Sequence, residues 1–279
     1  MGYADDHSLL KIIADKSDRI TAASDLNCDL AALYHFGQSW QIKFAPNKTS
    51  SLIVSLKHDL QSLPHPPLFL NDSVIPETSS VRVLGFTFDS LLTWEPHIVN
   101  ILNRGKQRAS QLYCCRSLLT SQDLSLMYKS WIRPALEYGN ILYAGAAFTH
   151  LQRLDRLQSR MEHTCCSHFQ SLLHRRNASI IGLVCRLLAG EGRGNLQNYC
   201  PPFRDVDNTR RQSTRLHAWD PAAHLRFIDP TDFKTLDRFR RSWQVVAVHL
   251  WNNLLLDLLL TGVTCGWRAI LKQAQCQVT

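Results

Sequence analysis

Two adjacent carboxylates near the start of the chain are the residues best suited to chemistry. Asp5 and Asp6 follow Tyr3-Ala4 and precede a run of β-strand formers over residues 7–13. This order predicts the tip of a β-hairpin, with both aspartates at the turn and residues 7–13 as the returning strand. Neighbouring carboxylates repel each other unless a cation bridges them, and Mg²⁺ prefers such oxygen ligands. The pair is therefore a candidate Mg²⁺ site of the kind used in two-metal phosphoryl or nucleotidyl transfer, although an ordinary solvated turn is the alternative that these four residues alone favour.

The rest of the chain reads as short strands followed by helices. The strands are expected as two within residues 40–57, two around Asn71-Asp72, and one over residues 81–88 in which Gly85 suggests a bulge. Apolar residues at three- and four-residue spacing predict helices over residues 17–39, 95–119, 121–144, 148–174, 175–189 and 236–259. Ser121 and Thr149 are expected helix caps, and Pro134 is expected to kink a helix or mark its boundary. Residues 190–235 are rich in Gly and Pro and predict a flexible linker. The pattern indicates an α+β fold.

Composition narrows the class of protein. A hydrophobic content of 45% over 279 residues supports a sizeable core. Nine cysteines, an odd number without a secretory signal, favour free thiols in a reducing compartment, so an intracellular location in cytoplasm or nucleus is expected, without secretion. The most apolar late stretch, residues 245–263, contains His249, Asn252 and Asp257, which predicts a buried amphipathic helix and no membrane span.

A second group of possible metal ligands lies in the middle of the chain. His163, Cys165, Cys166 and His168 could be argued as a zinc site. Their spacing fits no common zinc pattern, so a place in a helix core or on its surface is the preferred interpretation.

Positive charge is concentrated in the helical part of the chain. The net charge is +8, and residues 101–216 carry 17 basic and 7 acidic side chains. A basic surface of this kind attracts nucleic-acid phosphates, and arginine can contact a phosphate through two N–H groups. An ordinary solvated helical face is the alternative. The candidate phosphate-binding residues are Arg104, Lys106, Arg108, Arg116, Arg153, Arg156 and Arg160.

Tyr3-Ala4-Asp5-Asp6 resembles the catalytic motif of reverse transcriptases. The chain as a whole resembles the C-terminal part of the non-LTR (LINE-type, jockey-like) retrotransposon enzymes, because further stretches follow in that family's order and spacing. They are Trp40–Thr49, similar to the fourth palm motif; Val83–Asp89 and Leu92–Ile98, similar to the primer-grip hairpin and the entry to the thumb; Leu126–Gly139, similar to the thumb helices; and Phe239–Ser242 with His249–Leu254, similar to the region beyond the thumb.

The resemblance implies a fold, an activity and partners. Residues 1–92 would form a partial polymerase palm, of short antiparallel strands and one helix, with the primer-grip hairpin. Residues 93–189 would form a mainly helical thumb, and residues 190–279 a linker and C-terminal helical region. The implied activity is RNA-directed DNA polymerisation, with an RNA template, a DNA primer and deoxynucleotides. Asp5 and Asp6 would hold the metal. Lys48 would lie near the incoming nucleotide and help to protonate pyrophosphate, or it would be a simple exposed turn lysine.

One departure from the family pattern affects the expected activity. The family needs a third palm carboxylate and fingers residues that precede the Tyr3 motif, and this sequence contains neither. The chain alone is therefore expected to be inactive as a polymerase. Two alternatives stay open: a non-catalytic basic module that binds nucleic acid, and a translated remnant of marginal stability without a selected function.

Overall fold

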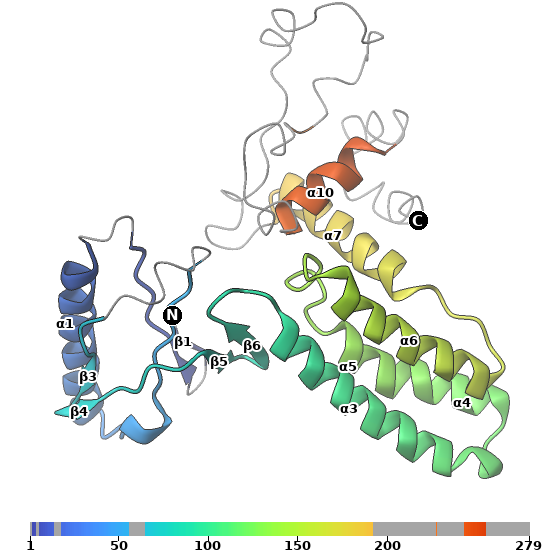
Figure 1. Ribbon diagram of the computed structural model, residues 1–279, viewed down its shortest axis with the longest axis horizontal. Helices are drawn as coiled ribbons and strands as arrows, with labels where there is room; N and C mark the ends of the chain where they lie inside the picture. Colours follow the sequence, from blue (N-terminus) through green and yellow to red (C-terminus); the bar gives the residue numbers. More distant parts are fainter. Residues whose placement is uncertain are drawn as a thin grey trace, which may run out of the picture. The chain divides into compact units, whose positions relative to one another are not determined.

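The computed structural model describes residues 2–3, 6–13, 18–55, 65–191, 227 and 243–254. The chain divides into two compact units, Met1–His97 and Ile98–Thr279 (Figure 1). In the described residues, the first unit holds three antiparallel hairpins and one long helix, whereas the second is helical. This combination confirms the predicted α+β class.

The N-terminal hairpin is confirmed, but its second strand is much shorter than predicted. Strand β1 (Gly2–Tyr3) pairs with β2 (Asp6–His7), so that Tyr3 lies opposite Asp6. The strand expected over residues 7–13 ends at His7, because no strand of the described chain pairs with the residues that follow. Leu10 and Ile12 are consequently 83% and 85% exposed.

Two further hairpins follow in the first unit. Strands β3 (Phe69–Leu70) and β4 (Ser73–Val74) pair around Asn71-Asp72, as predicted. Strands β5 (Ser80–Val83) and β6 (Phe86–Asp89) replace the single strand expected over residues 81–88. Leu84 and Gly85 both have positive φ, at 49° and 86°, so Gly85 serves a tight hairpin turn and not a bulge.

The helix of the first unit packs on one of these hairpins. Helix α1 (Asp18–Ser39) confirms the helix expected over residues 17–39, and its Leu30 forms a small core with Leu70 and Ile75. The two strands expected within residues 40–57 are wrong for the described part of that range. It holds instead the 3₁₀ turn η1 (Pro46–Lys48) and one isolated bridge from Ser51 to Glu77, because Pro46 interrupts the extended run.

The second unit begins as a bundle of helices. Helix α3 (Glu95–Cys114) is followed by the 3₁₀ turn η2 (Arg116–Leu118) and by α4 (Ser121–Met127). Thr120, and not the predicted Ser121, caps α4, because its hydroxyl accepts from Asp123 N–H in a capping box. The α4 helix continues as a π-helical turn, η3 (Tyr128–Ile132), and α5 (Arg133–Glu137). The helix expected over residues 121–144 therefore stops at Glu137, and the register changes just before Pro134, which has no N–H for an α-helical bond.

The last helices also differ from the predicted boundaries. The helix expected over residues 148–174 is α6 (Phe148–Cys165), which begins without a side-chain cap, so Thr149 is not its cap. Cys166 adopts a left-handed conformation with φ 49°, and Ser167 N–H donates to Glu162 C=O at 3.2 Å, which ends the helix in a Schellman-type turn. Helix α7 (Leu172–Leu188) confirms the helix expected over residues 175–189, but begins three residues earlier.

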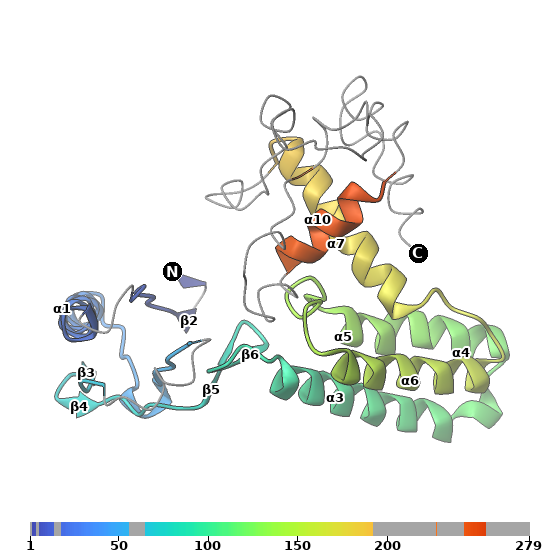
Figure 2. The same ribbon diagram turned by 45° about the horizontal axis from the view of Figure 1, so that its top comes forward.

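Helix α10 (Trp243–Asn252) closes the described chain, within the helix expected over residues 236–259. It packs against α7 around Trp251, Phe227 and Ile180 (Figure 2). The linker predicted over residues 190–235 lies almost wholly outside the described residues. Among the described helices, none is both long and apolar enough to cross a membrane.

Candidate nucleic-acid interface

The predicted catalytic residues all belong to the first unit. Asp5 lies outside the described residues, and Asp6 is described only as the backbone of β2, opposite Tyr3. Lys48 is exposed at the end of η1. In the described part of the chain, no three His, Cys, Asp or Glu side chains are grouped as metal ligands. Two adjacent carboxylates on a hairpin have the oxygen chemistry that a hard divalent ion prefers.

The alternative cluster around Cys165 does not have the character of a zinc site. Cys165 is buried, and burial raises the pKa of its thiol, which opposes the thiolate form that metals bind. Cys166, His163 and His168 are exposed, on both sides of the turn that ends α6. Cys166 and His163 take part in this helix end, because Cys166 N–H donates to the His163 carbonyl at 3.4 Å.

The carboxylates of the helical unit are engaged in internal contacts. Between Ile98 and Leu188 the acidic residues are Asp123, Glu137, Asp155 and Glu162. Asp123 belongs to the cap of α4, and its hydrogen bond from the Thr120 hydroxyl lowers the pKa of the carboxyl. Glu162 accepts hydrogen bonds from Phe169 N–H at 3.0 Å and Gln158 Nε2 at 3.4 Å. These two carboxylates therefore stabilise helix ends and the loop after α6.

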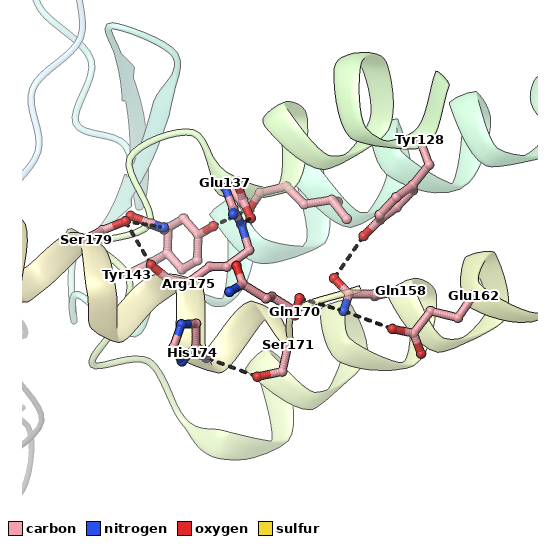
Figure 3. A network of polar contacts seen from close by, with 12 residues as sticks. Tyr128, Glu137, Tyr143, Gln158, Glu162, Gln170, Ser171, His174, Arg175 and Ser179 are labelled. Atoms are coloured by element: carbon pink, nitrogen blue, oxygen red, sulfur yellow. Dashed lines mark hydrogen bonds and ion pairs between the residues drawn. The ribbon is translucent and has the colours of Figure 1, made fainter. Parts of the chain in front are cut away.

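The other two carboxylates bind arginines of α7. Arg175 donates to both oxygens of Glu137, and these hydrogen bonds raise the pKa of the guanidinium (Figure 3). Arg176 is buried, and its Nη2 lies 3.5 Å from Asp155 Oδ1. Arg175 and Arg176 are thus neutralised inside the unit. These four carboxylates form no ion pair with the other arginines and lysines of the described residues.

Arg153, Arg156 and Arg160 form one exposed stripe on α6. Their spacing of three and four residues places them on one side of the helix. All three are exposed, and none forms an ion pair with a carboxylate of the described residues. Arg156 Nη2 donates to Gln152 Oε1 at 3.0 Å, which holds it along the helix surface. The predicted stripe is therefore brought together by the fold, on a helix side separate from the buried residues Leu151, Leu154, Leu157, Gln158, Met161 and Cys165.

A buried polar network fixes the rotation of α6 and thereby the direction of this stripe. Tyr128 donates its hydroxyl hydrogen to Gln158 Oε1 at 2.9 Å, and Gln158 Nε2 donates to the Gln170 carbonyl at 3.0 Å (Figure 3). Burial raises the pKa of Tyr128, which keeps the hydroxyl protonated as a donor. Sequence reasoning missed both residues. The sequence did contain a signal: Gln158 falls among the apolar, buried positions of α6, where a polar side chain needs a hydrogen-bond partner.

The basic residues of α3 do not share one face. Helix α3 packs on α5 and α6 at Gly105, where an added Cβ atom would lie 2.6 Å from Leu136 Cδ2 and 2.8 Å from Leu157 Cδ2. Arg104 and Lys106 flank Gly105 and point to opposite sides of this contact. They are both exposed.

Arg108, one of the candidate phosphate-binding residues, is half-buried and makes two packing contacts. Its Nη1 donates to the Trp131 carbonyl at 2.6 Å, and its guanidinium lies 5.6 Å from the Trp131 ring centroid. Trp131 belongs to η3, so the side of α3 that carries Arg104 and Arg108 faces η3 and α5.

Arg116 lies beyond the end of α3, in η2, and is exposed. Its Cζ atom lies 3.7 Å from the ring centroid of Tyr113 in a cation–π contact. Lys106 and the three α6 arginines thus belong to helices that contact each other at Gly105 and Leu157, while Arg116 occupies the turn after α3.

Comparison with known proteins shows what class of protein the chain is similar to. No protein-family model and no solved structure matches the chain. It is 32% identical over 162 residues to the RNA-directed DNA polymerase from mobile element jockey of Drosophila melanogaster, a match covering 57% of this chain and 17% of that protein. The corresponding enzyme of Drosophila funebris is 28% identical over 163 residues, covering 57% and 17% of the two chains.

A polymerase of another element gives a similar match. The probable RNA-directed DNA polymerase from transposon X-element of Drosophila melanogaster is 24% identical over 147 residues, covering 50% of this chain and 16% of that protein. The matched segment thus spans about one sixth of the length of these curated relatives. Over about half of its residues, the chain is therefore similar to the RNA-directed DNA polymerases of jockey-like, non-LTR mobile elements, which confirms the resemblance found in its motifs.

Proposed function

We propose that the helical unit binds the backbone of a primer–template duplex as the thumb of a non-LTR reverse transcriptase. The exposed stripe Arg153, Arg156 and Arg160 carries this proposal, because its charge is not neutralised by any described carboxylate. Backbone contacts of this type are insensitive to sequence, as a polymerase that copies every template position requires. The similarity to RNA-directed DNA polymerases supports an RNA template and a DNA primer as the nucleic acids. Such a function is exerted inside the cell, in cytoplasm or nucleus.

The first unit is, in the same proposal, part of the palm. Asp5 and Asp6 would hold Mg²⁺, which supplies charge stabilisation to the attacking and leaving oxygens of nucleotidyl transfer. Their chemistry as paired oxygen ligands supports this role. Lys48 is exposed, as a residue that contacts a nucleotide phosphate must be.

Neutralising the stripe is expected to weaken duplex binding strongly. In the variant Arg153→Gln/Arg156→Gln/Arg160→Gln, three phosphate contacts and their counterion release are lost. We expect an increase in Kd of about 10²-fold at ~0.1 M salt, and a decrease of about 3 in the slope of log Kd against log salt. Fluorescence anisotropy with an RNA–DNA duplex, titrated at several salt concentrations, measures both quantities.

A charge-matched variant controls for the loss of net charge. Lys11→Gln/Lys129→Gln/Arg186→Gln removes three exposed charges that are not among the candidate phosphate-binding residues. We expect it to change Kd by less than about threefold, because charges outside the stripe act only through screened, long-range attraction. Equal losses of affinity in the two triple variants would contradict a localised duplex-binding surface.

The 279-residue chain, purified by itself, is expected not to extend a DNA primer on an RNA template. The matched segment amounts to about one sixth of the length of the polymerases that it resembles, and two carboxylates of one hairpin supply few of the six ligands that Mg²⁺ takes. Primer extension with deoxynucleotides and Mg²⁺ measures this activity, with a full-length jockey polymerase as the positive control. Extension that disappears in Asp5→Ala would refute the prediction.

A non-catalytic nucleic-acid-binding protein is the second candidate function. The observation that favours it is that the arginine stripe belongs to the helical unit, whereas the aspartates belong to the other compact unit. Binding should then be unchanged in Asp5→Ala/Asp6→Ala. The two candidates differ in whether a longer protein that includes this segment polymerises DNA and loses that activity with the same substitution.

A further inference from the structure

The end of α3 presents an aromatic side chain together with an arginine. Tyr113 is 52% exposed, and the Arg116 guanidinium lies over its ring at 3.7 Å. The Tyr113 hydroxyl has no hydrogen-bond partner among the described residues, whereas those of Tyr128 and Tyr143 are bonded to Gln158 and the Leu136 carbonyl. Tyr128 and Tyr143 are therefore core residues, whereas the ring of Tyr113 is accessible to solvent.

This pair lies at the C-terminal end of α3 and in the turn η2 that follows it. Tyr113 follows Lys106 by seven residues, or about two helical turns, so the two side chains share one face of α3. Helices α3 and α6 run in the same direction and end at the same end of the bundle in both views (Figures 1 and 2), and Gly105 of α3 lies against Leu157 of α6. The pair is thus at the end of the bundle toward which the stripe from Arg153 to Arg160 runs.

The local charge suits a nucleic acid. In the chain between Glu95 and Glu137 the one acidic residue is Asp123, and its carboxylate accepts from Thr120 N–H and the Thr120 hydroxyl. Arg116 forms no ion pair with a described carboxylate. An arginine stacked on an aromatic ring offers a planar surface for a base and N–H donors for the adjacent phosphate.

We propose that Tyr113 and Arg116 form a stacking platform for an unpaired nucleobase at the end of the bound duplex. This inference rests on the proposed duplex binding by the helical unit and adds a second ligand class, single-stranded nucleotides, at a separate place. Stacking is tolerant of sequence because every base has a π face. The platform therefore holds a single-stranded extension of the duplex whatever its sequence.

Binding to two matched probes tests the platform with the full chain. One probe is a blunt RNA–DNA duplex, and the other is the same duplex with a short single-stranded overhang that contains a fluorescent purine analogue. In Tyr113→Ala we expect the Kd for the overhang probe to increase about tenfold and the stacking-dependent quenching of the analogue to disappear. The Kd for the blunt probe should change by less than about twofold, and Tyr113→Phe should retain quenching because it keeps the ring.

Tyr138→Ala serves as the matched control, because Tyr138 is also half exposed, at 55%, but follows α5. Equal effects of Tyr113→Ala and Tyr138→Ala, or equal losses for both probes in Tyr113→Ala, overturn the platform. Blunt-duplex binding without any gain from the overhang also overturns it and leaves duplex binding in place. Overhang binding that depends on Tyr113 without blunt-duplex binding supports the platform and refutes the duplex proposal. Absence of binding to either probe refutes both.

Discussion

Replacing Trp251 with alanine should destabilise the helical unit by about 3–5 kcal/mol. Trp251 is fully buried between α7 and α10, and its ring centroid lies 5.4 Å from that of Phe227. The substitution removes the largest side chain of this cluster and leaves a cavity. Ile180 and Val184, which line it, belong to a rigid helix and cannot fill it by a simple side-chain shift. Chemical denaturation followed by far-ultraviolet circular dichroism measures the loss.

The neighbouring Asn253 provides a control for this substitution. Its side chain is exposed, so Asn253→Ala should change the free energy of unfolding by less than about 0.5 kcal/mol. Hydrogen exchange adds a local readout, because amides of α7 should lose protection in Trp251→Ala. If Trp251→Ala unfolds at the same denaturant concentration as the unchanged chain, α10 does not pack on α7 through Trp251.

Replacing Gly105 with valine should destabilise the bundle by about 2–3 kcal/mol. The Cβ atom alone would approach Leu136 Cδ2 and Leu157 Cδ2 to 2.6 and 2.8 Å, and both leucines are buried, with exposed fractions of 1% and 5%. Their side chains can rotate, but they would rotate into occupied space. Valine adds two methyl groups to this steric overlap. The cost of the overlap exceeds the gain in helix propensity over glycine, which is below about 1 kcal/mol. Thermal unfolding of the purified chain measures the effect.

Two variants separate crowding from helix propensity. Gly105→Ala should lose about 1 kcal/mol, since one methyl group meets the same leucines but also favours the helix. Ser110→Val places valine at an exposed position of the same helix and should stay within about 0.5 kcal/mol. Stabilisation by Gly105→Val would mean that α3 does not approach α5 and α6 at this residue.

The sequence by itself determined which kinds of elements the chain forms. Alternation and apolar spacing depend on near neighbours, so the hairpins around Asn71-Asp72 and at the N-terminus and the helices α1, α3 and α7 could be predicted at least in part. The excess of basic residues and the motifs around Tyr3 and Trp251 likewise need no tertiary information. They were sufficient for the α+β class and for the resemblance to jockey-like polymerases, both of which are confirmed.

Tertiary structure decided the helix boundaries and which charges stay available. The end of α6 depends on the left-handed conformation of Cys166, which a cysteine does not predict. The loop after α6 is held by hydrogen bonds to Gln158 and Glu162. Arg175 pairs with a glutamate 38 residues away, and Arg108 with a carbonyl 23 residues away. The sequence does not distinguish an arginine with such a distant partner from an arginine that has no partner. The exposed stripe of α6 could therefore be proposed from its spacing, but only the fold separates it from the arginines that hold the bundle together.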